Sequence, residues 1–402
     1  MDQIALPREL KNLGGQILDV DSHEMIAAQR WGEVFGPEAG ELAEAFISSG
    51  ITDKEDKNAS NIPDWAGDTL AVDETVGTIK GARAPGANDI ARRLDVMDAM
   101  GVKRQLMYPT SVGFWATVLY MNHEDERLLR SIGGDRQAKA RTMLSSYNRW
   151  MMSEARRSDR IRPVPPVIAD TIDELMGTVN ELLAAGIKAV WLPSTILPGG
   201  VSPAHPDLDP FWAMLAEANC VVTSHVGSED KFFKLLNTWR DAPAFEGYRA
   251  LGEFSMDPWF TGNMHVPAQM FMSTLITGGV LERHPTLRVA ISELGGYWIG
   301  PMMETLDLWY RIGGSSKHPY RLKAPPSTFV KSNFRVSPFD FEDVAGYIER
   351  WGLEDVFCFA SDYPHVEGGK NAMTTFYNNI QRLGSDTVQK FFATNGQFIL
   401  PG

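Results

Sequence analysis

The sequence is poor in cysteine, has no long apolar run and is short of positive charge. Its 402 residues include 2 cysteines, Cys220 and Cys358, in apolar stretches, which predicts packed thiols in a reducing compartment and no disulfide framework. No apolar run approaches the roughly 18 residues that a membrane-spanning helix needs. Residues 1–13 also lack the basic start and long apolar run of a secretory signal. We therefore expect a cytoplasmic protein.

The charge balance excludes further classes of protein. The 38 Lys and Arg against 51 Asp and Glu give a formal net charge of −13 at pH 7. Such a protein repels phosphate backbones and anionic lipid surfaces unless basic residues gather in one patch, and the sequence has no such patch. It thus predicts no nucleic-acid and no membrane partner. The absence of internal repeats, low-complexity tracts and flexible linkers favours a single domain over residues 1–402.

What the sequence does contain is an alternation of apolar strand-like runs with helical patterns. We expect eight strands, at 16–21, 102–108, 162–168, 187–192, 220–224, 287–292, 333–336 and 356–360. The longest helical patterns between them lie at 89–100, 124–159, 171–185, 209–218, 232–250 and 266–281. Strands that alternate with helices form parallel βα units, so this α/β pattern predicts a (β/α)₈ TIM barrel. Insertions follow strand 1, at about 26–87, and strand 5.

Residues able to bind a metal ion stand at the ends of four of these strands. They are Asp21 and His23 after the first strand, His225 after the fifth, Glu293 after the sixth and Asp362 after the eighth. The carboxyl ends of barrel strands gather over one mouth, so side chains far apart in sequence meet there around one ion. The pattern predicts a metal-dependent enzyme with its site at that mouth.

Asp21 and His23 form a D-x-H motif within LDVDSHEM. Residues two apart on a strand face the same side, so this carboxylate and imidazole point together into the mouth. Short motifs also arise by chance, and Asp21 alone would serve as a cap. The company of His225 and Asp362 favours a metal site, because a buried carboxylate needs a partner and an ion supplies one. Such ligands suit one divalent ion, zinc first, with manganese or iron as alternatives.

Further polar residues near the strand ends are secondary candidates. His365, three residues after Asp362, is close enough to support that carboxylate. Glu24, His265 and Glu293 are candidates for additional metal or substrate contacts, although His265 equally fits a helix start. If they recruited a second metal ion, the site would resemble a dinuclear iron or manganese centre that activates oxygen.

Several longer phrases carry a family resemblance. The D-x-H motif, the His after strand five, the phrase GGVLERHPTLRVAISELGG and the terminal ASDYPH, with a closing Asn395, resemble the amidohydrolase superfamily in its amidohydrolase-related branch. That branch holds metal-dependent hydrolases, lactonases and non-oxidative decarboxylases of the aminocarboxymuconate-semialdehyde decarboxylase type. The resemblance implies a (β/α)₈ barrel with one divalent ion held by Asp21, His23, His225 and Asp362. It also implies that Asp362 handles the proton.

One position departs from the pattern of this family. Many members, decarboxylases included, carry a histidine in the phrase that reads SELGG here, so Glu293 stands in its place. This substitution argues against a mechanism in which that histidine polarises a carbonyl or protonates a ring. It also makes Glu293 a candidate ligand, and a candidate catalytic group beside Asp362.

Two reactions fit this set of residues, and the sequence favours hydrolysis. An ion held by two imidazoles and one or two carboxylates would activate water against an amide, lactone or related bond, with Asp362 as general base. The alternative is the loss of CO₂ from an aromatic-type carboxylic acid that chelates the ion. A non-enzymatic metal-bearing scaffold is a further reading, which the intact ligand set disfavours. We expect a small organic substrate, cyclic or carboxylated, and a homo-oligomer, such as a dimer, with a hetero-oligomer left open.

Overall fold

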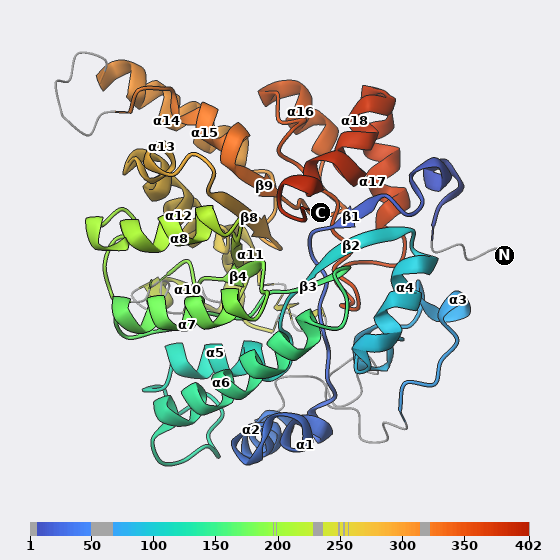
Figure 1. The fold of residues 1–402 in the computed structure, drawn as a ribbon, viewed down its shortest axis with the longest axis vertical. Coiled ribbons are helices and arrows are strands. Elements are labelled where there is room, and N and C mark those ends of the chain that lie inside the picture. Colours follow the sequence, from blue (N-terminus) through green and yellow to red (C-terminus); the bar gives the residue numbers. More distant parts are fainter. Residues whose placement is uncertain are drawn as a thin grey trace.

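The structure is a computed structural model that describes most of the chain (Figure 1). The described residues are 6–49, 67–195, 197, 199–227, 236–247, 250–251, 254–255, 257–313 and 322–401. Residues 50–66 of the expected first insertion lie outside this part, as do 232–235 and 248–249 of the helix expected at 232–250.

Parallel strands run through the middle of the molecule (Figure 1). They form two sheets, of order β1-β2-β3 and β4-β5-β8-β9. The strands are β1 (Ile17–Asp19), β2 (Val102–Met107), β3 (Ile161–Pro163), β4 (Ala189–Trp191), β5 (Val221–His225), β8 (Arg288–Ser292) and β9 (Phe334–Val336). An antiparallel pair, β6 (Ala250–Leu251) and β7 (Phe254–Ser255), belongs to the insertion that follows β5.

Backbone contacts join the two sheets into a ring. Pro166, just after β3, pairs in parallel with the last residue of β4. On the other side, the last residue of β9 pairs with Phe357, and the Val20 N–H donates a hydrogen bond of 3.1 Å to the Phe359 carbonyl. The segment around Phe357 is therefore the eighth member of the ring, and the predicted (β/α)₈ barrel is confirmed.

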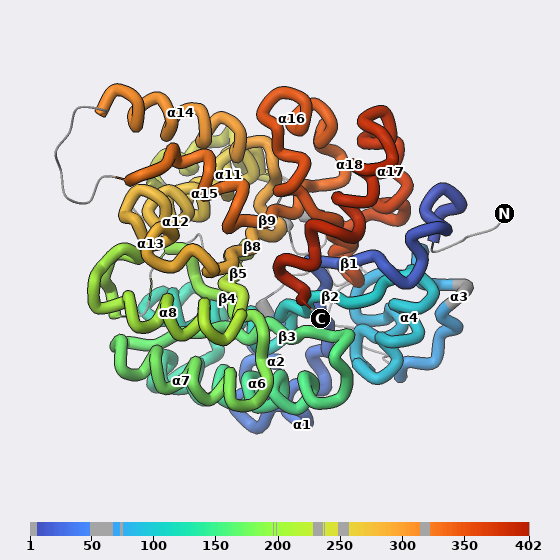
Figure 2. Tube along the Cα trace, turned by 45° about the horizontal axis from the view of Figure 1, so that its top comes forward, coloured from blue at the N-terminus to red at the C-terminus, as the bar shows by residue number. Residues whose placement is uncertain are grey.

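Helices surround this ring in both views (Figure 2). The helices of the first insertion are α1 (Trp31–Phe35), α2 (Pro37–Ser49) and α3 (Val72–Thr75). Those that alternate with the strands include α4 (Arg93–Ala99), α5 (Val112–Met121), α6 (Arg136–Ala155), α7 (Ile172–Ala184), α8 (Asp209–Glu217), α12 (Val266–Thr277), α13 (Val280–Arg283), α14 (Ile299–Ile312), α15 (Pro326–Asn333), α16 (Val344–Trp351), α17 (Ala372–Ile380) and α18 (Ser385–Gln389). Two short helices, α10 (Asn237–Arg240) and α11 (Pro258–Asn263), follow β5. Within the described part of the chain, no helix combines the length and apolar character needed to cross a membrane.

Two predicted helices differ from the structure. The helix expected at 124–159 begins only at α6, because Gly134 adopts a left-handed backbone with φ of 71° and the Asp135 side chain caps the helix at the Ala138 N–H. Helix α5, which precedes it, was not expected. The helix expected at 232–250 is not continuous, since its described part contains only α10, one turn of 3₁₀ helix and the first residue of β6.

Buried apolar side chains form two layers, one inside the ring of strands and one between the strands and the helices. The inner cluster fills the barrel and consists mainly of strand residues, among them Leu106, Ala189, Val221 and Cys358. A larger cluster, which includes Cys220, packs the outer faces of the strands against the helices. Both cysteines are free and buried, as the sequence predicts. The filled barrel leaves polar side chains at the carboxyl ends of the strands.

Candidate metal centre

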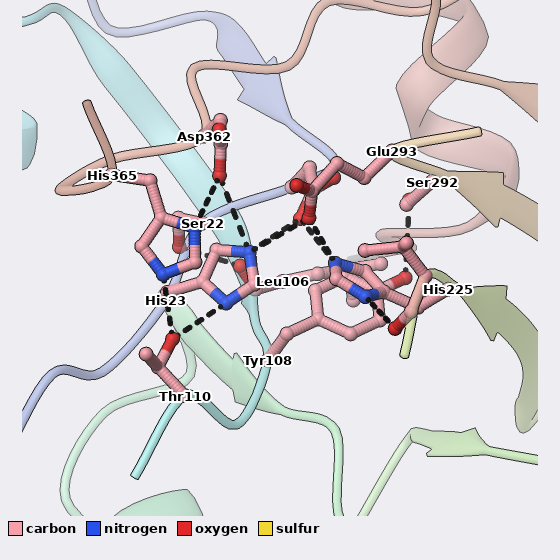
Figure 3. Close-up of polar contacts among 12 residues, drawn as sticks. Ser22, His23, Leu106, Tyr108, Thr110, His225, Ser292, Glu293, Asp362 and His365 are labelled. Carbon is pink, nitrogen blue, oxygen red and sulfur yellow. Dashed lines mark hydrogen bonds and ion pairs between the residues drawn. The ribbon is translucent and has the colours of Figure 1, made fainter. Parts of the chain in front are cut away.

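Five side chains from four strand ends converge at one mouth of the barrel, and Figure 3 shows four of them by label. Asp21 and His23 follow β1, His225 is the last residue of β5, Glu293 directly follows β8, and Asp362 follows the eighth segment. One ligand atom of each of the first four lies within 4.8 Å of the others, and a second overlapping group consists of His23, Glu293, Asp362 and His365. The structure thus brings together the residues proposed from the strand ends.

The distances within this cluster are short. His23 Nε2 lies 3.3 Å from Asp21 Oδ1, 3.3 Å from Asp362 Oδ1 and 3.9 Å from Glu293 Oε2. His225 Nε2 lies 3.1 Å from Glu293 Oε2 and 3.6 Å from Asp21 Oδ1. Two atoms that each bind one ion at about 2.0 to 2.3 Å are separated by distances of this order.

All five of these atoms are buried, and none has a hydrogen-bond partner among the described residues. Buried polar atoms in proteins are normally paired, and an unpaired one costs about 1–3 kcal/mol. Two imidazole nitrogens and three carboxylate oxygens converge here without hydrogen bonds, and of the other described residues only His365 adds an ion-pair contact, to Asp362 Oδ1. They form a donor set suited to a divalent cation. The residues present therefore fit a divalent metal ion.

Hydrogen bonds on the far side of each imidazole prepare it for this role. The Nδ1–H of His225 donates to the Val226 carbonyl at 2.9 Å, which leaves the lone pair of Nε2 directed at the cluster. Nδ1 of His23 lies 3.0 Å from the Thr110 hydroxyl, so it can donate there and leave its own Nε2 free. Such partners orient a ligating histidine and fix its tautomer.

His365 lies beside the cluster and supports Asp362 (Figure 3). Its Nδ1 is 3.2 Å from Asp362 Oδ1, and its Nε2 is 2.8 Å from the Thr110 hydroxyl. The ring also stacks on His23, with centroids 4.0 Å apart and planes at 20°. Thr110 therefore links the two histidines, and His365 holds the carboxylate of Asp362 from behind.

The backbone is strained at two of the five residues. Glu293 and Asp362 have φ angles of 54° and 49°, in the left-handed region that residues with a side chain rarely adopt. Such a conformation costs on the order of 1–2 kcal/mol, and it tends to occur at functional sites. The Asp362 N–H donates to the Asp21 carbonyl at 2.9 Å, which fixes the turn. The strained turns aim both carboxylates into the mouth.

Burial and neighbouring charges shift the pKa values of the cluster. Burial raises the pKa of Glu293 to about 8, and the charge of Asp362 adds to this effect. Burial alone would lower the pKa of His225, but Asp21 and Glu293 raise it well above its ordinary value. Burial likewise opposes protonation of His365, yet Asp362 and its other acidic neighbours raise the pKa to about 10. Without a bound ion, these groups hold protons near neutral pH.

These raised pKa values predict that binding of Mn²⁺ weakens as the pH falls. The pKa of Glu293 is about 8 and that of His225 is raised well above its ordinary value, so an ion must displace their protons. Each proton released gives roughly a tenfold loss of affinity per pH unit. Calorimetric titration of Mn²⁺ from pH 8 to pH 6, in buffers of different ionisation enthalpy, measures both the affinity and the number of protons released. An affinity that is constant over this range contradicts the assignment of these two ligands.

A cavity opens directly beside the cluster. Its walls are formed by Asp21, Glu293, Ser337, Pro338, Phe339, Asp340, Ala360, Asp362, Glu367, Gly368, Ala372 and Phe376. Five of these residues are acidic, and three of those five belong to the cluster. Other residues of the wall are apolar or aromatic, among them Phe339, which stacks on Phe341 at a centroid distance of 5.1 Å.

Glu24, a candidate for an additional metal contact, has a different position. Its Oε1 accepts hydrogen bonds from the backbone N–H of Thr110 and Ser111 and from the Tyr147 hydroxyl, at 2.7–3.0 Å. Its Oε2 accepts from the Ile26 N–H and the Ser111 hydroxyl. Both oxygens are therefore occupied, and Glu24 ties the segment after β1 to the start of α5 and to α6.

His265, the other distant candidate, also lies outside the cluster. Its Nδ1 is 2.9 Å from the Tyr297 hydroxyl, and its ring stacks on Trp298 at a centroid distance of 5.7 Å. Burial lowers the pKa of this histidine. It connects the start of α12 to the segment that follows Glu293, and these contacts lie outside the cluster.

Several residues that support the cluster were not found from the sequence. Thr110 gives no signal, because its two histidine partners are 87 and 255 residues away. Arg93 is fully buried and donates to the His23 carbonyl at 2.5 Å, although it stands in an amphipathic helical pattern that predicts an exposed arginine. Asp19 accepts from the Ser361 N–H at 2.9 Å and from its hydroxyl at 2.6 Å, and burial raises its pKa to about 7. The position of Asp19, two residues before Asp21, was the only feature of the sequence that indicated a role for it at the site.

Comparisons with known proteins give the family. A model of the amidohydrolase family matches residues 117–396. Among solved structures, an amidohydrolase from Mycobacterium avium subsp. paratuberculosis is 18% identical with a TM-score of 0.66, covering 96% of this chain and 98% of that chain. A 5-carboxyvanillate decarboxylase from Novosphingobium aromaticivorans, with bound manganese and 3-methoxy-4-hydroxy-5-nitrobenzoic acid, is 18% identical with a TM-score of 0.60 over 98% and 99%. A 2,6-dihydroxybenzoate decarboxylase from Rhizobium is 15% identical with a TM-score of 0.56 over 96% and 98%.

The family match covers more than half of the chain, so the protein belongs to the amidohydrolase superfamily, in its amidohydrolase-related branch. The resemblance carried by the D-x-H and ASDYPH phrases is thereby confirmed. A comparison with curated proteins gave no match. At these low identities the solved structures establish the shared barrel fold, and the reaction has to be argued from the site.

Proposed function

We propose that this protein is a non-oxidative decarboxylase that removes CO₂ from an aromatic-type carboxylic acid with the help of one divalent ion. The observation that carries this proposal is the convergence of five buried donor atoms that make no hydrogen bond, beside a cavity whose remaining wall contains Phe339 and Phe376. Chelating oxygens of a substrate would face the donors, while its ring would lie against apolar and aromatic side chains.

The residues that would hold the ion are Asp21, His23, His225, Glu293 and Asp362. A divalent ion in this place would supply a Lewis acid for a carboxylate and a neighbouring phenol oxygen of the substrate. The two groups of potential ligands share His23 and Glu293, which supports one ion and speaks against the dinuclear oxygen-activating alternative.

The chain supplies the proton that the reaction consumes. When the bond between the ring and the carboxylate breaks, its electron pair stays on the ring carbon, which takes up a proton as CO₂ leaves. Asp362 lines the cavity, and its Oδ1 is 3.2 Å from Nδ1 of His365. The other ring nitrogen of His365, Nε2, lies within hydrogen-bond distance of the Thr110 hydroxyl. We assign proton delivery to Asp362, with His365 as the group that returns a proton to it.

Glu293 offers a replacement for the histidine that many family members carry after strand six. Its pKa of about 8 lets this carboxyl hold a proton near neutral pH in the absence of an ion, as an imidazole would. Its φ of 54° turns the side chain toward His225 and the cavity. In the sequence, the absence of this histidine argues against decarboxylation. A carboxyl group that holds a proton in the same place weakens that argument.

The solved relatives support decarboxylation over hydrolysis. Proteins of the same fold include decarboxylases that act on 5-carboxyvanillate and 2,6-dihydroxybenzoate, and some of these structures hold manganese. Manganese is thus a reasonable first ion for assays, although the N and O donors accept zinc and iron as well. Hydrolysis of an amide or lactone, which the sequence favours, stays a prediction that the same assay tests.

The test is to incubate Mn²⁺-loaded protein with a panel of hydroxybenzoic acids in D₂O. We expect one CO₂ for each product molecule and one deuteron on the carbon that carried the carboxylate, and we expect chelation by EDTA to abolish both. Headspace analysis and NMR of the product measure them. A parallel incubation with amides and lactones in H₂¹⁸O gives the contrary outcome: labelled products without CO₂ would replace decarboxylation with hydrolysis.

A further inference from the structure

A second cavity lies at the end of helix α5 and shares no lining residue with the cavity beside the metal cluster. Its volume is about 190 Å³. Its walls come from the last residues of α5, the first turn of α6 and the segments that follow β3 and β4. An apolar cavity of about 150 Å³ can hold one benzene ring. The second cavity is therefore large enough for a single six-membered ring with a small substituent.

Most of the wall of this second cavity is apolar. The apolar side chains in it are those of Met121, Val167, Ile168, Ala169, Pro193 and Leu197. Met121, Ala169 and Leu197 are buried, so these side chains are already removed from water before a ligand enters. A wall of this kind favours a flat apolar ligand, because a ring fills the space with van der Waals contacts and leaves no polar group unpaired.

The polar part of the wall consists of Tyr120, His123, Gln137 and Asp170. The Tyr120 hydroxyl donates to Asp170 and also forms a hydrogen bond with the side chain of Gln137. Arg141 donates to Asp170 and to Glu174, so two carboxylates share one guanidinium at this edge of the cavity. The excess of negative charge repels an anionic ligand. The cavity thus favours a neutral one.

His123 supplies a polar atom that a ligand can use. Its Nδ1–H donates to the Tyr120 carbonyl at 2.8 Å, so Nε2 of the neutral ring carries a lone pair that accepts a hydrogen bond. Nε2 makes no hydrogen bond to any residue in the described part of the chain. A ligand that fits this cavity therefore needs a hydroxyl or N–H group on its ring.

We propose that this cavity is a second binding site, which binds a small neutral ring with one hydrogen-bond donor, of the phenol class. The ring would lie against Met121, Ile168 and Leu197, and its hydroxyl would donate to His123 Nε2. The site needs neither the metal ion nor the proposed reaction. Phenols are also the class of product that the proposed decarboxylation would release, and this link alone rests on the proposed function.

The experiment compares two probes of similar size, 4-fluorophenol and 4-fluorotoluene, which differ in a hydroxyl against a methyl group. Titrations followed by ¹⁹F NMR use protein loaded with Zn²⁺, which is diamagnetic, and protein treated with EDTA. We expect both probes to bind with and without the ion. A probe that binds only to the Zn²⁺-loaded protein lies at the metal cluster and overturns the site, as does the absence of binding at millimolar concentration.

The variant His123→Leu removes the acceptor from a half-buried position. It should weaken binding of 4-fluorophenol roughly 3- to 10-fold, the usual contribution of one hydrogen bond, and change binding of 4-fluorotoluene less than about twofold. The matched control is His205→Leu, at another half-buried histidine that does not line the cavity, and it should bind both probes as the parent protein does. Equal weakening of both probes by His123→Leu, or no weakening, contradicts the role of His123.

The variant Ala169→Phe places a ring in the cavity. It should weaken both probes at least about tenfold, because the new side chain occupies the space that a probe needs. Ala91→Phe adds the same ring at an exposed position and should leave both affinities unchanged. Thermal unfolding of both variants checks that they fold, and the His123 comparison still decides if Ala169→Phe does not. A folded Ala169→Phe that binds as the parent does places the probes elsewhere.

The outcomes also separate this inference from the proposed function. If the probes bind as expected and no aromatic acid loses CO₂, the second site stands and only its link to a product is wrong. If CO₂ is released and the parent protein binds neither probe outside the metal cluster, the reaction stands and the second site is wrong.

Discussion

Replacing Asp362 with asparagine is expected to lower kcat by about two to four orders of magnitude, the usual contribution of a positioned proton-transfer group. The amide keeps the shape of the side chain and its place on the strained turn, but it cannot carry the proton that passes between His365 and the substrate. The measurement is kcat at saturating substrate and Mn²⁺, with the metal content of the variant determined by elemental analysis.

The control for this substitution is Asp95→Asn, which changes an exposed aspartate on α4 and should leave kcat unchanged. Because Asp362 also belongs to the donor set, the metal content decides between two explanations of a slow variant. A variant that is slow with full Mn²⁺ content has lost proton transfer, and one that is slow and empty has lost a ligand. A variant that keeps both its ion and its rate removes Asp362 from the mechanism.

The fold and the cluster were predictable because both depend on regular features of the chain. Apolar runs that alternate with helical patterns define βα units, and the end of each strand is visible where the apolar run stops at a polar residue. His225 and Glu293 are both found in this way. A barrel brings all strand ends to one mouth, so the topology alone predicts that residues hundreds of positions apart approach each other.

The supporting residues were not predictable, because their roles depend on distant partners. Glu24 stands next to His23 in the sequence, yet most groups that bind its carboxylate lie 86 to 123 residues further along the chain. In the sequence, Glu24 is an acidic residue just after a strand, as the candidate ligands are, so the sequence alone does not separate it from them. Arg93 stands in an amphipathic helical pattern, where an arginine normally remains in water, and its burial becomes visible only once its side chain reaches the His23 carbonyl.

Helix boundaries failed for a different reason. The segment 124–135 has the polar composition of an exposed helix, and such a composition fits turns equally well. In the structure, the buried Arg136 binds the carbonyls of Leu129 and Ile132, which holds the turns against the start of α6. The side-chain hydrogen bonds of a single arginine thus hold turns in a segment whose composition also fits a helix.

Replacing Glu293 with glutamine is expected to weaken Mn²⁺ binding by a factor on the order of 100, the upper part of the range seen when groups around a metal are changed. Glutamine keeps the length of the side chain but removes the negative charge of the atom that lies 3.1 Å from His225 Nε2. Because Glu293 has a pKa of about 8, the variant should also release fewer protons when Mn²⁺ binds near pH 7. Calorimetry in two buffers measures both quantities.

A second substitution, Glu293→His, separates the role of the charge from the role of a donor atom. Histidine restores the residue that many family members carry and supplies a nitrogen ligand without a negative charge. If Glu293 acts as a donor, Glu293→His should bind Mn²⁺ more tightly than Glu293→Gln and regain part of the rate of CO₂ release. If both variants keep the full metal content and the full kcat of the parent protein, Glu293 is a structural residue. The cluster would then contain four donors, and the strained turn at Glu293 would serve only to close the barrel mouth.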